Sequence, residues 1–245
     1  FRWTNEIIGG GDPEFQSGKD ATETFDQARM EVFQYFTDLV DERRKHPTND
    51  VTSIIANAKI DGAPVAALEL LSYLLLLVVA GNETTRNATS GGLLALIENP
   101  AEFRRLKSDP SLIKTAVEEI VRWTSPVIQF TRTAASDTSV RGQKIRAGES
   151  VCLFYPSASR DEDVFDQPFK FDVGRNPNPH LSFGIGEHFC LGANLARLEL
   201  SVIFSQLAQR LDHAELTGPA ERLRSSFVGG IKHMPIRYKI KPAQQ

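Results

Sequence analysis

The sequence predicts a mainly α-helical protein with small β-sheets. The strongest observation is an apolar pattern from Pro64 to Glu98, in which Pro64 suits a first helical position and Asn99-Pro100 ends the pattern. At 1.5 Å per residue such a helix spans about 50 Å, enough to cross a whole domain. Two further observations are a row of apolar residues at helical spacing after Cys190 and several short strand-like runs. The helical row is Leu191, Leu195, Leu198, Val202 and Leu207, and the runs are 127–133, 139–145 and 150–155.

Local residue chemistry predicts the remaining elements. Amphipathic spacing indicates helices, Ser111 is a suitable N-cap, glycine marks turns, and prolines interrupt regular structure. In chain order, the other expected elements are a helix over 22–45, a short helix over 51–58, a turn at Asp61-Gly62, a helix over 111–123, turns at 141–142 and 147–148, irregular structure over 161–179 and a hairpin over 223–235.

The composition excludes several classes of protein. The 245 residues are 41% hydrophobic and 24% charged, which is ordinary for a globular protein with a substantial core. The net charge of −3 gives no general affinity for nucleic acid or acidic membranes. Two cysteines, Cys152 and Cys190, argue against a disulfide framework and favour a reducing cytosol. The apolar run from Leu68 to Ala80 is too short to cross a bilayer, so we expect a cytoplasmic protein without a membrane span.

The centre of the long predicted helix is polar. The segment from Ala80 to Thr85 places glycine, asparagine, glutamate and two threonines inside an otherwise apolar pattern. Glycine costs about 1 kcal/mol relative to alanine in a helix interior, and threonine hydroxyls can bond to carbonyl groups and bend the helix. On the pattern alone two interpretations stay open: a functional bend, and a satisfied polar patch on a surface helix.

Cys190 stands in a glycine-rich segment, from Phe183 to Gly192, just before a predicted helix. Glycine lets the backbone bend and approach a flat partner closely. Unpaired N–H groups and the positive end of a helix dipole favour a thiolate, and a thiolate ligates soft or redox-active metals. A lone cysteine is more commonly a buried structural residue, and a zinc site would need further Cys or His ligands.

The segment reads Phe-Gly-x-Gly-x-His-x-Cys-x-Gly, and this pattern resembles the haem-binding loop of the cytochrome P450 family. The resemblance implies a haem b cofactor with the Cys190 thiolate as axial ligand of its iron, an arrangement that favours O–O cleavage. It also implies that Arg132 and His188 contact the haem propionates through charge-assisted hydrogen bonds. The other implied haem contacts are Phe183, Gly184, Gly186 and Gly192.

Further motifs resemble the same family. Ala-Gly-x-Glu-Thr resembles its oxygen-activation segment, in which Glu83 would be the acid and Thr84 the alcohol of a proton relay. Glu119 and Arg122 resemble its core ion pair, and Arg175 falls where the third partner lies, which implies a structural role. By resemblance, the substrate pocket would be lined by Val79, Ala80, Val127, Ile128, Phe227 and Val228.

The resemblance implies one haem-thiolate monooxygenase domain over 1–245, with the C-terminal portion of the P450 fold and without the family's N-terminal part. The implied reaction hydroxylates a C–H bond of a sterol, an isoprenoid or a methyl-branched lipid. Electrons would come from a ferredoxin-type donor with its reductase, since no flavin or nicotinamide motif is present in these residues. Two alternatives stay open: a haem-binding protein without O₂-dependent turnover, such as a sensor or peroxygenase, and a non-catalytic truncated fragment.

Overall fold

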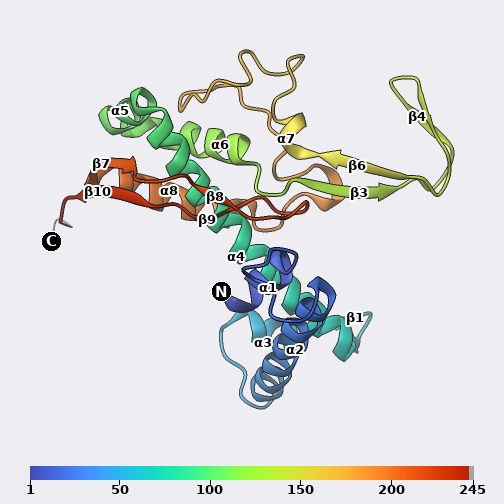
Figure 1. Cartoon of the computed structure of the whole chain (residues 1–245). Helices are drawn as coiled ribbons and strands as arrows, with labels where there is room; N and C mark the ends of the chain where they lie inside the picture. Colours follow the sequence, from blue (N-terminus) through green and yellow to red (C-terminus); the bar gives the residue numbers. More distant parts are fainter. Residues whose placement is uncertain (243–245) are drawn as a thin grey trace. The chain divides into compact units, whose positions relative to one another are not determined.

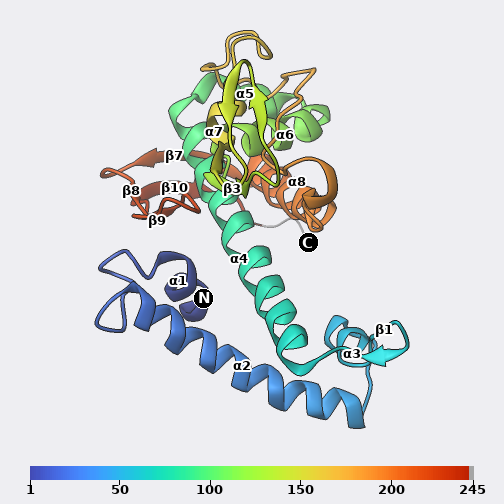
Figure 2. The same ribbon diagram turned by 90° about the vertical axis from the view of Figure 1, so that its right-hand side faces the viewer.

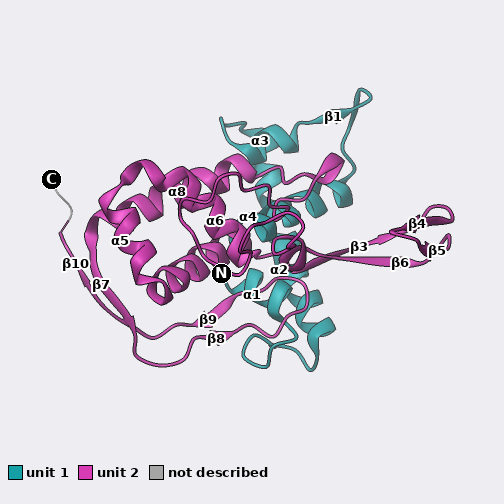
Figure 3. Cartoon of the chain, turned by 90° about the horizontal axis from the view of Figure 1, so that it is seen from above, with its two compact units in different colours: residues 1–83 teal, residues 84–245 magenta. Residues whose placement is uncertain are grey.

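The computed structural model describes residues 1–242, which form two compact units, Phe1–Glu83 and the part from Thr84 onward (Figure 3). Helices predominate, and every sheet among the described residues is two-stranded (Figure 1). The predicted class, mainly α with small β-sheets, is therefore confirmed. The expectation of a single domain over 1–245 stays a prediction.

Unit 1 is built around α2 (Ala21–Lys45), which packs with α1 (Arg2–Gly9) and α3 (Val51–Ala56) (Figure 2). The side chains of Asp20 and Asp50 cap α2 and α3 by accepting backbone N–H bonds. The predicted helices over 22–45 and 51–58 are thus confirmed, whereas the sequence pattern does not reveal α1, which has no side-chain cap. The buried core of the unit is Val32, Phe36, Val40, Ala56, Leu70 and Leu74.

The long helix, α4 (Ala67–Glu98), begins later than the start predicted at Pro64. Pro64 instead lies in β2 (Ala63–Pro64), which pairs with β1 (Lys59–Ile60) across the Asp61-Gly62 turn. Both turn residues have positive φ, 51° for the aspartate and 81° for the glycine. The fixed φ of proline is compatible with an edge strand as well as with a helix start. Here the pairing of β2 with β1 places Pro64 in a strand.

Unit 2 holds the remaining part of α4 and the elements that follow it. Its further helices are α5 (Pro100–Ser108), the 3-10 turn η1 (Pro110–Leu112), α6 (Ile113–Thr124), α7 (Tyr155–Ala158), the 3-10 turn η2 (Gly186–His188) and α8 (Ala193–Arg210). Its strands are β3 (Gln129–Thr133), β4 (Thr138–Val140), β5 (Gln143–Ile145), β6 (Ser150–Phe154), β7 (Leu211–Leu216), β8 (Glu221–Arg222), β9 (Ile231–His233) and β10 (Ile236–Ile240).

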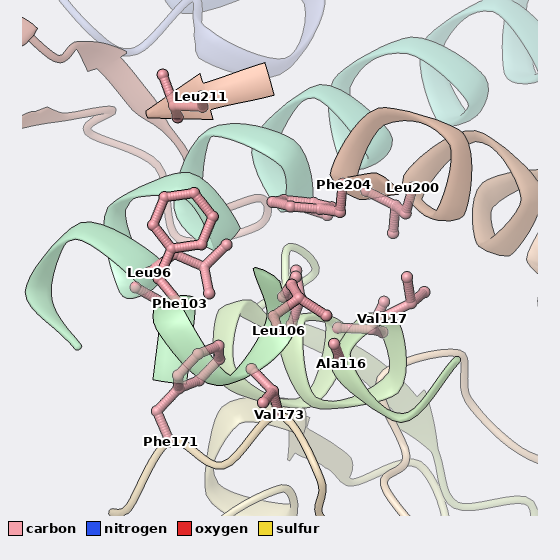
Figure 4. Packing of buried hydrophobic residues seen from close by; sticks show 14 residues of the cluster. Leu96, Phe103, Leu106, Ala116, Val117, Phe171, Val173, Leu200, Phe204 and Leu211 are labelled. Atoms are coloured by element: carbon pink, nitrogen blue, oxygen red, sulfur yellow. The ribbon is translucent and has the colours of Figure 1, made fainter. Parts of the chain in front are cut away.

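The core of unit 2 joins α4, α5, α6 and α8 to the irregular segment 161–179 (Figure 4). α6 is strongly amphipathic, and its buried face packs against α8. Phe171 and Val173 bring the irregular segment into the same core. Other buried members shown in Figure 4 are Leu96, Phe103, Leu106, Ala116, Val117, Leu200, Phe204 and Leu211. The core therefore fixes the irregular segment that precedes the Cys190 loop and helix α8 that follows it.

The predicted strands form antiparallel pairs. β3 pairs with β6, and Figure 3 shows this ribbon carrying β4 and β5 at its far end. The predicted run 139–145 is the β4–β5 hairpin, which turns at Arg141-Gly142 as expected. In the tail, β8 pairs with β9, so Phe227 and Val228 lie in the connection of the predicted hairpin. The pairing of β7 with β10 was missed: β10 alternates between apolar and polar residues, but β7 (Leu211–Leu216) does not alternate clearly.

One helix was missed by the predictions, and one N-cap was assigned to the wrong residue. Pro100 ends the α4 pattern, but it is also the first residue of α5, a position that suits proline. The N-cap expected at Ser111 is wrong: Asp109 caps η1 by accepting hydrogen bonds from the Ser111 N–H and hydroxyl at 3.0 and 2.6 Å. Both differences have the same cause. Pro100 suits the end of one helix and the start of the next, and Asp109 and Ser111 are both suitable N-cap residues.

Gly92 and Gly81 lie in the same helix but in different surroundings. A Cβ at Gly92 would stand 2.6 Å from atoms of Ile120 and Phe204, whereas a Cβ at Gly81 would meet nothing within 4 Å. We expect Gly92→Ala to lower the free energy of unfolding by about 1–3 kcal/mol through overpacking. Gly81→Ala should raise it by up to about 1 kcal/mol, since alanine is the better helix former. Urea unfolding measures both changes, and a stabilised Gly92→Ala protein would contradict the tight packing.

Among residues 1–242, α4 is the helix long and apolar enough to cross a membrane by length and composition alone. The core helix of a soluble protein satisfies the same criterion, so this observation is weak evidence for a membrane span.

Candidate functional site

The loop that carries Cys190 is closed by its own backbone. The Cys190 N–H donates to the carbonyl of Phe183 at 2.9 Å, and the Phe189 N–H donates to the carbonyl of Gly186 at 3.0 Å. Gly184 and Gly186 adopt φ values of 75° and 72°, where a side chain would strain the backbone. The two glycines therefore allow the tight loop that presents the cysteine.

Cys190 stands two residues before Gly192, the N-cap of α8. Its thiol is partly exposed. A Cβ at Gly192 would lie 4.0 Å from the sulfur, so the glycine leaves the space beside the thiol free of a side chain. The neighbouring side chains of Ile185 and Leu191 are 76% and 80% exposed, which leaves an apolar surface beside the thiol. A single soft ligand within an apolar surface fits a flat, apolar, iron-containing macrocycle.

A zinc site does not have its ligands at this loop. Among residues 1–242, no three His, Cys, Asp or Glu side chains gather in a group that could hold a metal ion. A structural zinc site uses four such ligands and a catalytic site three. A metal held at this loop would therefore have the Cys190 thiol as its cysteine ligand, without a cluster of further protein ligands among the described residues.

Arg132 and His188 are both exposed. Arg132 donates to its neighbouring carbonyl at Thr131, its guanidinium lies 6.0 Å from the Phe130 ring centre, and no described carboxylate is within ion-pair distance of it. His188 ends η2, two residues before Cys190. Each side chain is thus available to an anionic group, and their contacts with haem propionates stay a prediction.

Glu119 and Arg122 lie one turn apart on α6, and neither side chain is exposed to solvent. Arg122 donates two hydrogen bonds to the Glu119 carboxylate, at 2.7 and 2.8 Å. The same guanidinium donates to the carbonyls of Ser159 and Pro168, at 2.7 and 2.9 Å, and more weakly to that of Lys170. Every polar group of this buried pair therefore has a partner, as burial of a charge requires.

Arg175 joins the pair from the irregular segment. Its Nε donates to Glu119 at 3.1 Å, and its other nitrogens donate to the carbonyls of Asp166, Gln167 and Lys170. Glu119 also accepts from the backbone N–H of Asp172, at 2.9 Å. The structure thus brings the three predicted ion-pair residues together, and they hold the segment that leads to the Cys190 loop.

A second charged cluster borders the loop, and the sequence pattern does not reveal it. Arg197 of α8 donates two hydrogen bonds to the Glu118 carboxylate, at 2.7 and 2.9 Å, and His180 Nε2 lies 3.1 Å from the same group. Burial raises the pKa of Glu118, but the bonds from His180 and Arg197 outweigh it and lower the value to about 2. The Arg197 guanidinium also lies 4.6 Å from the Phe183 ring centre, so this ion pair supports the start of the loop. The sequence did contain one signal for this cluster, the adjacent pair Glu118 and Glu119. Successive residues of a helix point in different directions, so the two carboxylates must have different partners.

Glu83 and Thr84 are consecutive residues of α4. The Glu83 side chain is 1% exposed and accepts a hydrogen bond from the Thr4 hydroxyl at 2.8 Å. Thr84 is partly buried. Thr4 was not among the predicted site residues, because no local pattern links α1 to a carboxylate 79 positions later.

The predicted substrate-pocket residues fall in two groups. In unit 2, Val127 and Val228 form an antiparallel bridge, and the Ile128 N–H donates to the Phe227 carbonyl at 2.8 Å. The Phe227 ring also contacts Phe130, with ring centres 5.3 Å apart. This arrangement makes one apolar wall from segments a hundred residues apart. In unit 1, Val79 is partly buried and Ala80 is exposed on α4.

Comparisons with known proteins match nearly the whole chain. The protein-family model described as "Cytochrome P450" matches residues 109–241, which is more than half of the chain. A methyl-branched lipid omega-hydroxylase of Mycobacterium tuberculosis is 47% identical over 240 residues, covering 97% of this chain and 55% of that protein. A steroid C26-monooxygenase of Rhodococcus jostii is 42% identical over 240 residues, covering 98% of this chain and 49% of that protein.

The fold is similar to solved structures as well. A Mycobacterium marinum cytochrome P450 in complex with pseudoionone is 41% identical, with a TM-score of 0.92 over 96% of this chain and 57% of that chain. The chain spans about half the length of the curated relatives it matches. It therefore has part of the fold of these proteins.

Proposed function

Because the chain belongs to the cytochrome P450 family, we propose that it is part of a haem-thiolate monooxygenase acting on a hydrophobic substrate. One atom of O₂ enters a C–H bond, and the other leaves as water with two electrons and two protons. The observation that carries the proposal is the partly exposed Cys190 thiol, held in a glycine-bent loop directly before α8.

Haem b fits the residues around Cys190. When bound, it supplies iron that takes the thiolate as ligand and activates O₂. The chain's own part would be to hold the group: Cys190 would ligate the iron, Ile185 and Leu191 would offer apolar surface to the ring, and Arg132 and His188 would donate to its carboxylates. The ion pairs that Glu118 and Glu119 of α6 form with Arg197 and Arg175 stabilise the position of the loop.

Glu83 and Thr84 deliver protons in this proposal. The Thr84 hydroxyl donates to the reacting oxygen, and the Glu83 carboxyl group, supported by Thr4, restores the proton. Burial of an acid in the middle of a largely apolar helix is costly, and its position beside an alcohol supports a role in chemistry in addition to the bond with Thr4.

The proposed substrate is a sterol, an isoprenoid or a methyl-branched lipid. Its support is the apolar wall of Val127, Phe227 and Val228, together with the names of the relatives, which act on a methyl-branched lipid and a steroid. Electrons come from a ferredoxin-type donor with its reductase, and the reaction takes place in the cytoplasm.

Thr84→Ala tests the proton-delivery step in the haem-loaded chain. We expect unchanged haem and substrate binding, product formation lower by roughly 10²-fold or more, and reducing equivalents diverted into hydrogen peroxide or water. The measurement is the amount of product and of peroxide per electron pair consumed. Thr89→Ala is the matched control, because it removes the same group from the same helix at a position with no assigned role in proton delivery. Unchanged coupling in Thr84→Ala would remove the assigned role.

A further inference from the structure

Unit 2 contains a cavity of about 760 Å³ that the proposed reaction does not use. Its volume is in the range of about 300–1,000 Å³ typical of small-molecule sites. Cys190, Thr84, Phe227 and Val228 are not among its lining residues, whereas Ile128 contributes to its wall. The apolar part of the lining is Leu94, Ala95, Trp123, Ile128, Pro156, Phe169, Leu223 and Ile231.

Arg160 is the charged group built into this wall. It is partly buried, its nitrogens donate to the carbonyls of Trp123 and Pro156 at 2.7 and 3.3 Å, and no described carboxylate lies within ion-pair distance. Burial lowers the pKa of Arg160, and so does the positive charge of Arg122, which only Glu119 opposes. A guanidinium has five N–H donors, so three are left for a ligand. A half-buried cation without an anion is costly, and it favours an anionic occupant of the cavity.

Two further donors line the same cavity. Arg222 is exposed and has no ion pair among residues 1–242, so it can add positive charge at the mouth. Asn87 is 5% exposed, and its Nδ2 is buried without a hydrogen-bond partner in the described structure. Glu98 is the opposing charge in the lining, but it is exposed and therefore screened by solvent. The lining thus has a net positive charge beside a largely apolar surface.

We propose that this cavity binds an amphipathic carboxylate, with the carboxylate on Arg160 and the hydrocarbon chain against Leu94, Trp123 and Ile231. A carboxylate accepts two hydrogen bonds from one guanidinium, which gives a fixed orientation. The apolar lining then shields the chain from water. The site shares Ile128 with the predicted substrate pocket, but it includes neither the Cys190 loop nor Thr84.

The probe is 12-bromododecanoate, whose bromine quenches tryptophan fluorescence at short range. The chain has two tryptophans, and Trp3→Phe leaves Trp123, which lines the cavity, as the only reporter. We expect saturable quenching that unlabelled dodecanoate reverses. Dodecanol, which has the same chain without the charge, should compete at least about tenfold more weakly, since hydrogen bonds to charged groups carry the preference.

Three variants in the Trp3→Phe background place the binding. Arg160→Gln and Arg222→Gln should each weaken dodecanoate, the former by about tenfold, and should leave dodecanol unchanged. Ser157→Phe, at an exposed position of the lining, should weaken both compounds by filling the mouth. Arg146→Gln, an exposed arginine outside the lining, is the matched control.

The results separate the possibilities. Arg160→Gln removes the hydrogen bond to the Trp123 carbonyl of α6. If this variant does not fold, Arg222→Gln and Ser157→Phe still test whether the acid binds in this cavity. Absent or non-saturable quenching would overturn the proposal, and so would equal affinity for acid and alcohol. Binding that is unchanged in Arg222→Gln and in Ser157→Phe would place the acid elsewhere and overturn it too.

Discussion

Cys190→Ala is expected to abolish the red-shifted Soret band that thiolate-ligated haem shows in its reduced, carbon monoxide-bound form. The reason is that Cys190 is the one cysteine of the loop, and the other cysteine, Cys152, lies on β6. The shift depends on electron density from the axial sulfur, so haem held by another ligand lacks it. The measurement is the absorption spectrum of the reduced protein under carbon monoxide, after reconstitution with haem.

Cys152→Ala is the matched control for the same spectrum. Cys152 is an exposed residue of β6, and its thiol lies 3.1 Å from the Gln129 side-chain oxygen on the neighbouring strand. Its removal should leave the band intact. A band that survives in Cys190→Ala would refute the assignment of the ligand, and a wild-type chain that never shows it with haem supplied would refute the proposed cofactor site.

Arg122→Leu is expected to lower the free energy of unfolding by about 3–5 kcal/mol, because the substitution leaves the Glu119 charge in the core without its main partner. The carbonyls of Ser159 and Pro168 would also lose their donor. Urea unfolding followed by circular dichroism measures the change.

Arg237→Leu is the control for removal of an arginine from an ion pair. Arg237 bonds to Glu215 at 2.8 Å, but their side chains are 75% and 43% exposed. Exposed pairs contribute about 0–1 kcal/mol, so the unfolding free energy should change little. Equal losses in the two variants would show that burial of the Arg122 pair adds nothing to the stability of the fold.

Local patterns predict the helices and the Cys190 loop well, for a physical reason. Helix period, glycine placement and the spacing around Cys190 are properties of neighbouring residues, and α2, α8 and the β4–β5 turn follow from them. Glu119 and Arg122 were also within reach, since their contact spans one helical turn. The start of α4 was placed at Pro64 and not at Ala67, and α5, which begins at Pro100, was missed, because each proline suits two kinds of position.

Contacts between distant segments could not be predicted in this way. The bond from Thr4 to Glu83 and the pairing of Arg197 with Glu118 both join elements that the chain brings together only on folding. The cavity beside Arg160 has the same origin, because its wall combines α4, α6, α7 and the tail hairpin. Such features depend on tertiary packing, about which a single sequence has no local signal.

The way Arg122 and Arg175 hold the irregular segment determines which changes that segment tolerates. Their guanidinium groups bond to the backbone oxygens of Ser159, Asp166, Gln167, Pro168 and Lys170. A carbonyl oxygen is present whatever the side chain, so substitutions at the exposed positions among them, Asp166, Gln167 and Lys170, leave the acceptors in place. An inserted or deleted residue shifts every acceptor along the chain and breaks several bonds at once. The segment between α7 and the Cys190 loop is therefore held to its length, and its exposed positions are free to diverge in composition, whereas core residues such as Phe171 and Val173 are not.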